Sequence, residues 1–345
     1  MATTLPTFTK RIDDAFTETW YEIQAEAIDN ILNATPIWAI LKLKGCFTPQ
    51  SGSDMITRTI RYGTQASVDV KKGDTLPQGE PELETVARWT FRHLATHVQR
   101  DLFTDRENRG KFKIKDYVAK RLQAARDSMV QQYETEVTAA FSAAAETTSK
   151  AIQGLNELLP PYANACTGTY GLIARPATLA ASGNVYKPAT GNTWWGSAYK
   201  AMTLPVEVNL ADDMRSLYNG ISDNMEPPDL IISDLNPYEY YESYGLDMSQ
   251  IVKDEGGQMV DLGFSVLRFR GKPWIWSNNV ALSGPKMEVL MLNTKYIEVV
   301  YDPGMWFDMT EWKSIPLQAT RIAHILSACN IITTQPRRHG RLYEA

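Results

Sequence analysis

The sequence predicts an α+β protein, and two patterns carry that prediction. Apolar side chains recur every three or four residues from 113 to 146 with no Gly or Pro between them, which is the stripe of one long helix. At 1.5 Å per residue this helix would be about 50 Å long. Before it, two β-type segments flank a polar stretch, as in a long β-hairpin. Such a rod suits an extended subunit better than a compact enzyme, although an all-α bundle could also contain one.

The composition bounds the class of protein. The chain of 345 residues is 43% hydrophobic and 22% charged, as a folded soluble protein of one large or two modest domains is. No apolar run approaches the roughly 18 residues of a membrane span, and residues 1–14 lack the apolar core of a signal peptide. We therefore expect a cytoplasmic product with no membrane partner. The net charge of −5 argues against a strong general nucleic-acid binder.

Two residue types add detail. Cys46, Cys166 and Cys329 lie far apart, which suits reduced core thiols better than disulfides or a metal site. Nine Trp and sixteen Tyr favour extensive protein interfaces, because aromatic side chains bury much area at low entropic cost.

The N-terminal part is predicted as an arm followed by a helix. Residues 1–10 read as a loose arm. A helix is expected over residues 11–32, with Phe16 and Trp20 on its apolar side. Residues 36–47 are apolar and fit either a helical turn or a strand, and the pattern does not decide between them.

The hairpin is predicted to pair residues 56–62 with one strand over residues 86–98. Its tip, residues 69–84, is polar and rich in Gly and Pro. A hairpin of this length is marginal alone and needs a surface to lie against, on its own chain or on a neighbour. Four of its side chains are candidate contacts: Trp89 and Phe91 on the second strand, and Lys71 and Lys72 at the tip.

The second half is predicted to mix helices and strands. Residues 160–192 are irregular and are expected to be an exposed loop. A helix is expected to restart at Trp194, to break near Pro205 and to resume over residues 210–218. The remaining expected elements are a buried strand at 228–233, a helix at 238–244 capped by Asn236, paired strands at 266–270 and 274–276, another pair at 288–293 and 296–301, a long strand at 317–328, and a last strand at 331–342 with a basic cluster.

No pattern makes a convincing catalytic site. Phosphate-loop, dinucleotide, zinc-protease and nucleophile-elbow motifs are missing from the sequence. His93 and His97 share a strand face but would lie about 13 Å apart, too far to hold one metal. Purely structural roles are preferred for the other candidates. These are a core role for His324, surface charge for Asp212 and Asp213, and packing for Tyr238, Tyr240, Tyr241 and Tyr244. We expect no catalytic, metal or cofactor site.

Several short segments resemble one known family. They are Gly154 to Pro160 (GLNELLP), Tyr170 to Arg175 (YGLIAR) with Trp194 and Trp195, Pro228 to Ser233 (PDLIIS), Phe269 to Trp274 (FRGKPW), and Leu292 to Tyr296 (LNTKY) with Trp306 and Trp312. Their order, and the order of arm, hairpin, long helix and mixed half, is similar to that of the tailed-bacteriophage major capsid proteins. The resemblance covers nearly the whole chain and implies the Hong Kong-type capsid fold.

That fold implies a division of the chain: residues 1–33 as N-terminal arm and helix, 34–51 as peripheral domain, 52–98 as extended loop, 99–155 as peripheral domain with the spine helix, 156–296 as axial domain, 297–326 as peripheral strands, and 327–345 as the axial C-terminal strand. The resemblance also implies contacts between subunits, for which Phe16, Trp20, Trp89, Phe91, Lys71 and Lys72 are the candidates. Some members join a loop lysine covalently to a neighbour's asparagine, but a polar tip carries lysines in any case, and we expect no cross-link.

The implied function is structural and not enzymatic. Copies would form hexamers and pentamers of an icosahedral shell around phage double-stranded DNA, in the virion after assembly in the host cytoplasm. The implied partners are the protein itself, a separate scaffold protein, a portal protein and weakly bound DNA, with a decoration protein left open. Cations of the spine helix and of residues 337–341 are candidates for the DNA-facing surface. Alternatives are an encapsulin-like compartment shell and a carbohydrate-binding or carbohydrate-active protein.

Overall fold

The structure is a computed structural model that describes residues 35–65, 67–76, 79, 81–103, 117–142, 149–222, 226–247, 267–277 and 287–344. Residues 35–345 form one compact unit. The predicted arm, its helix, Phe16 and Trp20 lie outside the described residues. So do Lys113 and Lys115, two cations at the start of the expected spine helix.

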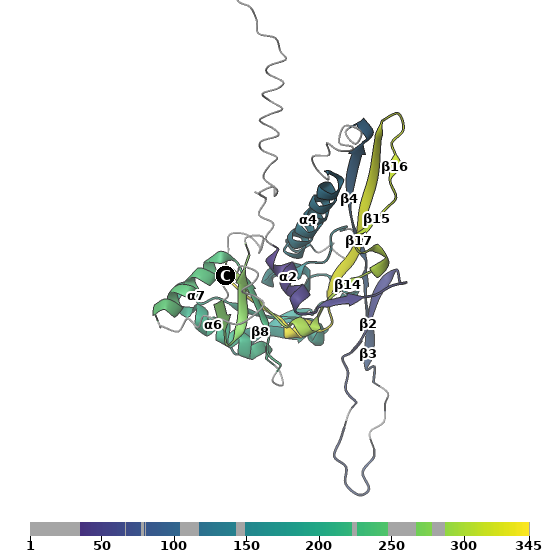
Figure 1. The fold of residues 1–345 in the computed structure, drawn as a ribbon. Helices are drawn as coiled ribbons and strands as arrows, with labels where there is room; N and C mark the ends of the chain where they lie inside the picture. Colours follow the sequence, from purple (N-terminus) through teal and green to yellow (C-terminus); the bar gives the residue numbers. More distant parts are fainter. Residues whose placement is uncertain are drawn as a thin grey trace, which may run out of the picture. The chain divides into compact units, whose positions relative to one another are not determined.

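A six-stranded sheet is built around the long strand β17 (Thr320–Thr333). On one side β17 pairs with β4 (Arg92–Asp101) over ten residues. On its other side it pairs with β14 (Ile297–Tyr301), β15 (Asp308–Met309) and β16 (Lys313–Ser314), as Figure 1 shows. The short β1 (Phe47–Pro49) runs parallel to β14 at the edge.

The spine helix α4 covers residues Tyr117–Val137 of the described chain. Its Met129 packs with Val98 of β4 and Ile325 of β17, so α4 covers one face of the six-stranded sheet. The expected helix over 113–146 is wrong at its C-terminal end, because residues 138–142 are not helical.

Residues 36–47 resolve into the helix α2 (Pro36–Leu43) followed by β1. The first backbone N–H groups of a helix have no partner within the helix. Here Ile37 and Trp38 donate theirs to the carboxylate of Glu134 on α4, at 3.0 and 2.8 Å. Burial raises the pKa of Glu134, and the two backbone hydrogen bonds partly offset that rise. Glu134 therefore ties the start of α2 to the spine helix.

The hairpin consists of β2 (Met55–Arg61) and β3 (Glu84–Thr90), which pair only with each other. The prediction of one strand over 86–98 is wrong, because the chain breaks at Phe91 and continues as β4 in the six-stranded sheet. Odd-numbered Ala87 and Trp89 are buried before the break, and even-numbered Val98 is buried after it. One residue out of register reverses the faces of a strand. The buried positions therefore switch from odd to even numbers at Phe91, where the chain passes from the hairpin into the six-stranded sheet.

An eight-stranded sheet forms the other large layer, in the order β11, β12, β10, β13, β18, β9, β8, β7. Its strands are β7 (Thr178–Ser182), β8 (Val185–Thr190), β9 (Ala198–Ala201), β10 (Leu230–Ser233), β11 (Leu267–Phe269), β12 (Lys272–Trp276), β13 (Glu288–Leu292) and β18 (Gly340–Tyr343). Helices α6 (Val206–Ile221) and α7 (Leu235–Asp247) pack their apolar residues against it in one core cluster.

Several predictions for the second half need correction. Residues 178–190 are strands β7 and β8 and not part of a loop, because their sheet partners supply the order that the sequence pattern lacks. Strands β13 and β14 do not pair with each other, since they belong to different sheets. The turn at Thr193–Trp195 is one turn of 3₁₀ helix. Helix α7 begins at Leu235, before the expected cap Asn236.

Strand β17 also crosses an expected boundary. It runs without a break to Thr333, so residues 327–333 continue the strand of residues 320–326 in the six-stranded sheet. The other short elements are α5 (Leu155–Leu158), β5 (Thr169–Tyr170), β6 (Ile173–Ala174) and 3₁₀ turns at Tyr162–Asn164, Thr294–Tyr296, Pro303–Met305 and Pro336–Arg338. No helix among the described residues is long and apolar enough to cross a lipid bilayer.

Candidate functional site

The base of the hairpin is locked to the rest of its own chain. Arg58 of β2 donates from Nη2 to the Glu298 carboxylate of β14 at 2.7 Å. The ring of Tyr62, just beyond β2, stacks on Trp194 with the centroids 4.7 Å apart and the planes at 13°. The Trp89 ring is 3% exposed and lies edge-on to Tyr170. These contacts hold the paired strands along their length, and the loop of residues 63–83 lies beyond them.

The YGLIAR segment supplies most of that anchor. Gly171 has a φ of +63°, and a Cβ there would lie 2.7 Å from the Trp89 ring, so only glycine fits beneath the indole. The Gly171 carbonyl accepts a hydrogen bond from the Arg88 N–H at 3.0 Å. The Tyr170 hydroxyl accepts one from the Thr333 N–H at 2.9 Å. The segment thus joins the hairpin to the end of β17.

The GLN segment packs against the last turn of the spine helix. A Cβ at Gly154 would lie 2.5 Å from the Glu136 carbonyl oxygen and 2.6 Å from that of Val137, so glycine lets this segment meet the last turn. The Asn156 side chain donates to the carbonyls of Thr138 and Ala139, at 3.4 and 2.8 Å. Thr138 and Ala139 directly follow Val137, the last helical residue, so Asn156 holds the non-helical turn just beyond the end of the helix.

A buried cation, Arg341, links Asn156 to the eight-stranded sheet. Arg341 of β18 is fully buried, and its guanidinium donates twice to the Glu288 carboxylate of β13. It also donates to the Asn156 side-chain oxygen at 2.9 Å and to the Leu159 carbonyl at 2.8 Å. The Arg341 side chain thus connects β13 and β18 to Asn156 and to the end of the short helix α5.

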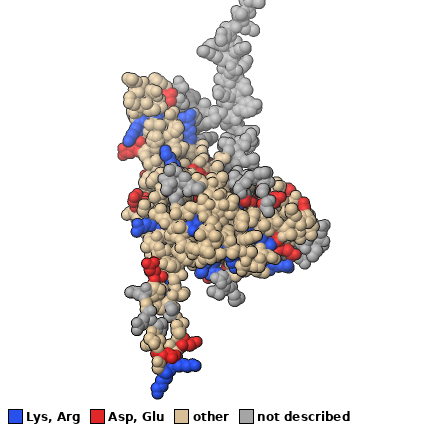
Figure 2. Space-filling model, turned by 180° about the vertical axis from the view of Figure 1, so that it is seen from behind, with Lys and Arg blue, Asp and Glu red and all other residues tan. Residues whose placement is uncertain are grey.

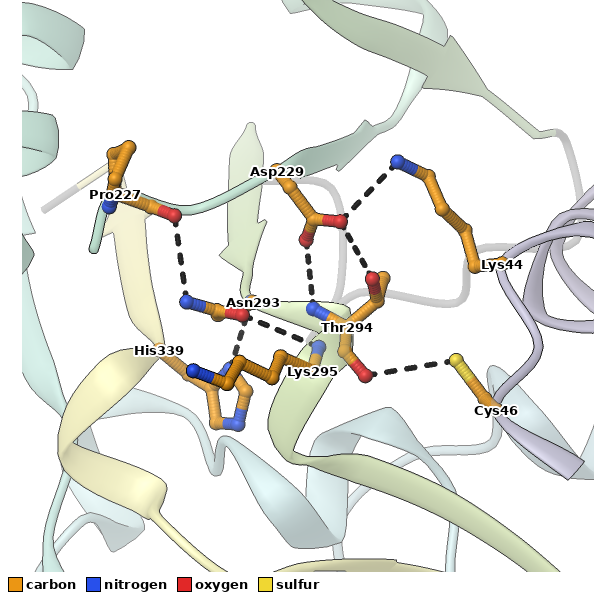
Figure 3. A network of polar contacts seen from close by, with 8 residues as sticks. All are labelled: Lys44, Cys46, Pro227, Asp229, Asn293, Thr294, Lys295 and His339. Carbon is orange, nitrogen blue, oxygen red and sulfur yellow. Dashed lines mark hydrogen bonds and ion pairs between the residues drawn. The ribbon is translucent and has the colours of Figure 1, made fainter. Parts of the chain in front are cut away.

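Figure 3 shows a second polar network, where the chain crosses from one sheet to the other. Asp229 accepts from the Thr294 N–H at 2.7 Å, from the Thr294 hydroxyl at 2.5 Å and from Lys44 at 3.2 Å. The Asn293 N–H donates to His339 Nδ1 at 3.2 Å. Residues 293–296 connect β13 to β14, so these contacts fix the crossing point.

His339 is the fully buried member of that network. Burial lowers the pKa of its imidazole to about 3, so the ring is neutral. Because Nδ1 accepts from Asn293, Nε2 carries the proton and donates to the Thr333 hydroxyl at 2.9 Å. The second crossing, from β17 to β18, is therefore tied to the first.

The predicted contact residues have different positions. Lys71 and Lys72 are exposed at the hairpin tip, and Phe91 is partly buried against the chain's own core. The prediction that Trp89 contacts a neighbour needs correction, because its indole is 3% exposed and is enclosed by its own chain. Sequence periodicity could not separate these cases, because an apolar strand face looks the same whichever chain covers it.

Other candidates changed as well. His324 is exposed and not a core residue. Asp213 is buried and accepts from the Thr203 N–H at 2.6 Å, which is a structural role and not surface charge. Cys166 is exposed, unlike Cys46 and Cys329. The packing interpretation is confirmed for Tyr238 and Tyr241, whose rings contact Trp274.

The expected basic cluster at residues 337–341 is divided. Arg341 and Arg338 are buried, and only Arg337 remains exposed. Figure 2 shows basic and acidic side chains mixed over the face that it displays.

The described residues offer little for catalysis. No group of three or more His, Cys, Asp or Glu among them could hold a metal ion. A hollow of about 580 Å³ lies between the hairpin base and residues 334–337, and one of about 300 Å³ lies beside it. Both share Arg337, and neither is lined by a carboxylate. Paired carboxylates, which glycoside hydrolysis requires, are missing from these two hollows.

No family model matches the sequence, and no curated protein is similar enough in sequence to match. Solved structures do match. The cyanophage A-1(L) capsid is 14% identical with a TM-score of 0.56, over 92% of this chain and 94% of that one. The capsid of Myoviridae phage XM1 is 8% identical with a TM-score of 0.55, over 93% and 96%. The SrpI encapsulin complex of Synechococcus elongatus is 13% identical with a TM-score of 0.55, over 92% and 90%.

These matches define the class of fold. The chain has the α+β fold of phage capsid and encapsulin subunits, in matches that span about nine tenths or more of each chain. The Hong Kong-type capsid fold expected from the sequence is confirmed.

Proposed function

We propose that this protein is the major capsid subunit of a tailed bacteriophage, and that its copies assemble into hexamers and pentamers of an icosahedral shell around double-stranded DNA. The observation that carries the proposal is the whole-chain match to capsid subunits, which leaves no additional domain among the described residues that would need another function. The neighbours are structural proteins of shells, which supports a non-enzymatic role.

The hairpin supports assembly on physical grounds. Its two strands pair only with each other, and Val68, Val70, Leu76 and Val86 are exposed on it, between 44 and 66%. A two-stranded hairpin with exposed apolar side chains is marginally stable in water and gains from a partner surface. We propose that a neighbouring subunit provides that surface, with Lys71 and Lys72 at its edge. Phe91, Phe16 and Trp20 remain candidate contacts.

The proposed partners follow from the same assignment. They are further copies of the chain, a separate scaffold protein, a portal protein and weakly bound DNA, and a decoration protein is a further candidate. Arg337 is the exposed member of the C-terminal basic cluster and is the proposed contact with DNA in that region. The proposed location is the virion, after assembly in the host cytoplasm. The domain boundaries proposed from the resemblance are kept, except that residues up to 333 go with the peripheral part.

A second candidate is an encapsulin-like shell with a protein cargo, and the SrpI match favours it specifically. The fold alone does not separate a DNA container from a protein container. The phage assignment rests on the long hairpin and on the YGLIAR segment noted in the sequence.

Electron microscopy of the purified protein tests the proposal. We expect closed shells tens of nanometres across, and small discrete particles would contradict it. Extraction of nuclease-treated particles then identifies the cargo. Protected DNA supports the phage assignment, and a co-purified enzyme without DNA supports the encapsulin-like alternative.

A hairpin variant tests the role of the loop. Replacing residues 64–81 by a short turn is expected to leave the subunit folded, because the anchoring contacts of β2, β3, Tyr62 and the YGLIAR segment lie outside the replaced residues. The same replacement is expected to abolish shell formation. Inserting two glycines into the β7–β8 turn after Gly183, which has open space around it, is the control and is expected to leave assembly intact. Normal shells from the tip-deleted variant would refute the role of the hairpin.

A further inference from the structure

Three of the four histidines of the chain lie on one face of the six-stranded sheet. His93 and His97 are on β4 and His324 is on β17, and all three are exposed. Val98 and Ile325, their neighbours along the strands, point to the opposite face and pack on the spine helix. Because side chains alternate along a strand, the histidines project away from that helix.

His97 and His324 are direct cross-strand partners in the β4–β17 ladder. The His324 carbonyl accepts from the Thr310 N–H at 2.8 Å, and the His324 N–H donates to the Thr310 hydroxyl at 2.9 Å. Both backbone groups of His324 thus point away from β4. In an antiparallel ladder this makes the His97–His324 pair a non-hydrogen-bonded one.

A second contact confirms this alternation. The Leu102 N–H donates to the Ala319 carbonyl at 3.0 Å. The even-numbered positions of β4 are therefore the ones that are hydrogen-bonded to β17. His97, an odd-numbered position, falls on a close pair. Residues at such a pair have Cα atoms about 4.5 Å apart and Cβ atoms about 4.5–5.5 Å apart.

Two imidazoles at this spacing can bind one ion, because zinc–nitrogen bonds are about 2.0–2.1 Å long and the rings turn about their side-chain bonds. Imidazole is the ligand that Zn²⁺, Cu²⁺ and Ni²⁺ favour among protein side chains of intermediate softness. His93 lies four positions from His97 along the same strand, about 13 Å away, and cannot join them.

We propose that His97 and His324 form a binding site for one divalent transition-metal ion per subunit, on the face of the six-stranded sheet opposite the spine helix. No third His, Cys, Asp or Glu completes a metal cluster in the described part of the chain, so water would fill the remaining positions. Such an ion would join β4 to β17 and stabilise the sheet, since a ligand that binds only the folded state favours it.

Calorimetric titration of the untagged protein with Ni²⁺ tests the site. We expect one ion per subunit, with at least tenfold weaker binding after His97→Ala and after His324→Ala. His93→Ala is the matched control on the same face and should bind as the wild type does. Circular dichroism checks that the variants are folded, and His97→Gln provides a second replacement of similar size.

Three results would overturn the assignment: no binding by the wild type, unchanged binding after either substitution of the pair, or an equal loss in the His93→Ala control. The measurement is independent of shell formation, so its failure leaves the proposed capsid function untouched.

Discussion

Replacing Arg341 with methionine should destabilise the subunit strongly. The guanidinium is fully buried, and its removal leaves the Glu288 carboxylate, itself 3% exposed, without a counter-charge. Breaking one partner of a buried ion pair costs about 3–5 kcal/mol. The Asn156 oxygen and the Leu159 carbonyl also lose their donor, and each unsatisfied acceptor costs about 1–3 kcal/mol before the surroundings relax. We expect a total loss of at least about 4 kcal/mol.

A loss of that size is a large part of a typical folding free energy of about 5–15 kcal/mol. At about 2 °C per kcal/mol for a chain of this length, the melting temperature should fall by roughly 8 °C. Thermal unfolding followed by circular dichroism measures it. The same replacement at Arg215, whose ion pair with Asp212 is exposed, is the matched control and should cost less than about 1 kcal/mol.

A double variant tests the physical reason. Adding Glu288→Leu to Arg341→Met removes the unpaired carboxylate and should recover at least half of the lost stability, because an apolar pair can replace a buried ion pair. If the single variant loses less than about 1 kcal/mol, or if the two changes simply add, the buried charge is not what holds this junction.

Three further predictions concern other contacts. Gly154→Ala should lower the free energy of unfolding by about 2 kcal/mol or more, because its Cβ would meet two helix carbonyls, and denaturant titration should show no such loss for Gly304→Ala, where the nearest atom is 3.4 Å away. Trp89→Ala should cost about 3–5 kcal/mol of subunit stability; a stable subunit that fails only in assembly would restore its interface role. The free energy of unfolding of the wild type should fall by up to about 1.4 kcal/mol per pH unit from pH 6.5 towards 3. The reason is that the histidine binds a proton in the unfolded chain, whereas burial keeps His339 neutral in the folded one. His339→Gln should flatten that slope.

Much of the fold could be predicted because its signals are local. The stripe of the spine helix and the β-branched runs of the hairpin reflect which side chains must leave water, and neighbouring residues carry that information. The family resemblance added the order of the parts. It also pointed to Gly154, Asn156, Gly171 and Arg175 as motif members, although their contacts were not predictable.

The errors fall where distant segments decide. The strand over 86–98 splits at Phe91 because its two halves pair with different partners. Residues 178–190 become strands because β9 lies beside them. His324 looked like a core residue because its strand is apolar, but it faces away from the spine helix.

The sequence by itself determined the class of the protein: an α+β chain with a long hairpin, a spine helix and capsid-like segments. Only the tertiary structure decided what those segments do. It placed Trp89 inside its own chain, bonded Asn156 to the turn that follows the spine helix, and buried Arg341 between two strands. The physical reason is that periodicity records whether a side chain is buried, whereas the partner that buries it, or that accepts its hydrogen bond, is chosen by residues far along the chain.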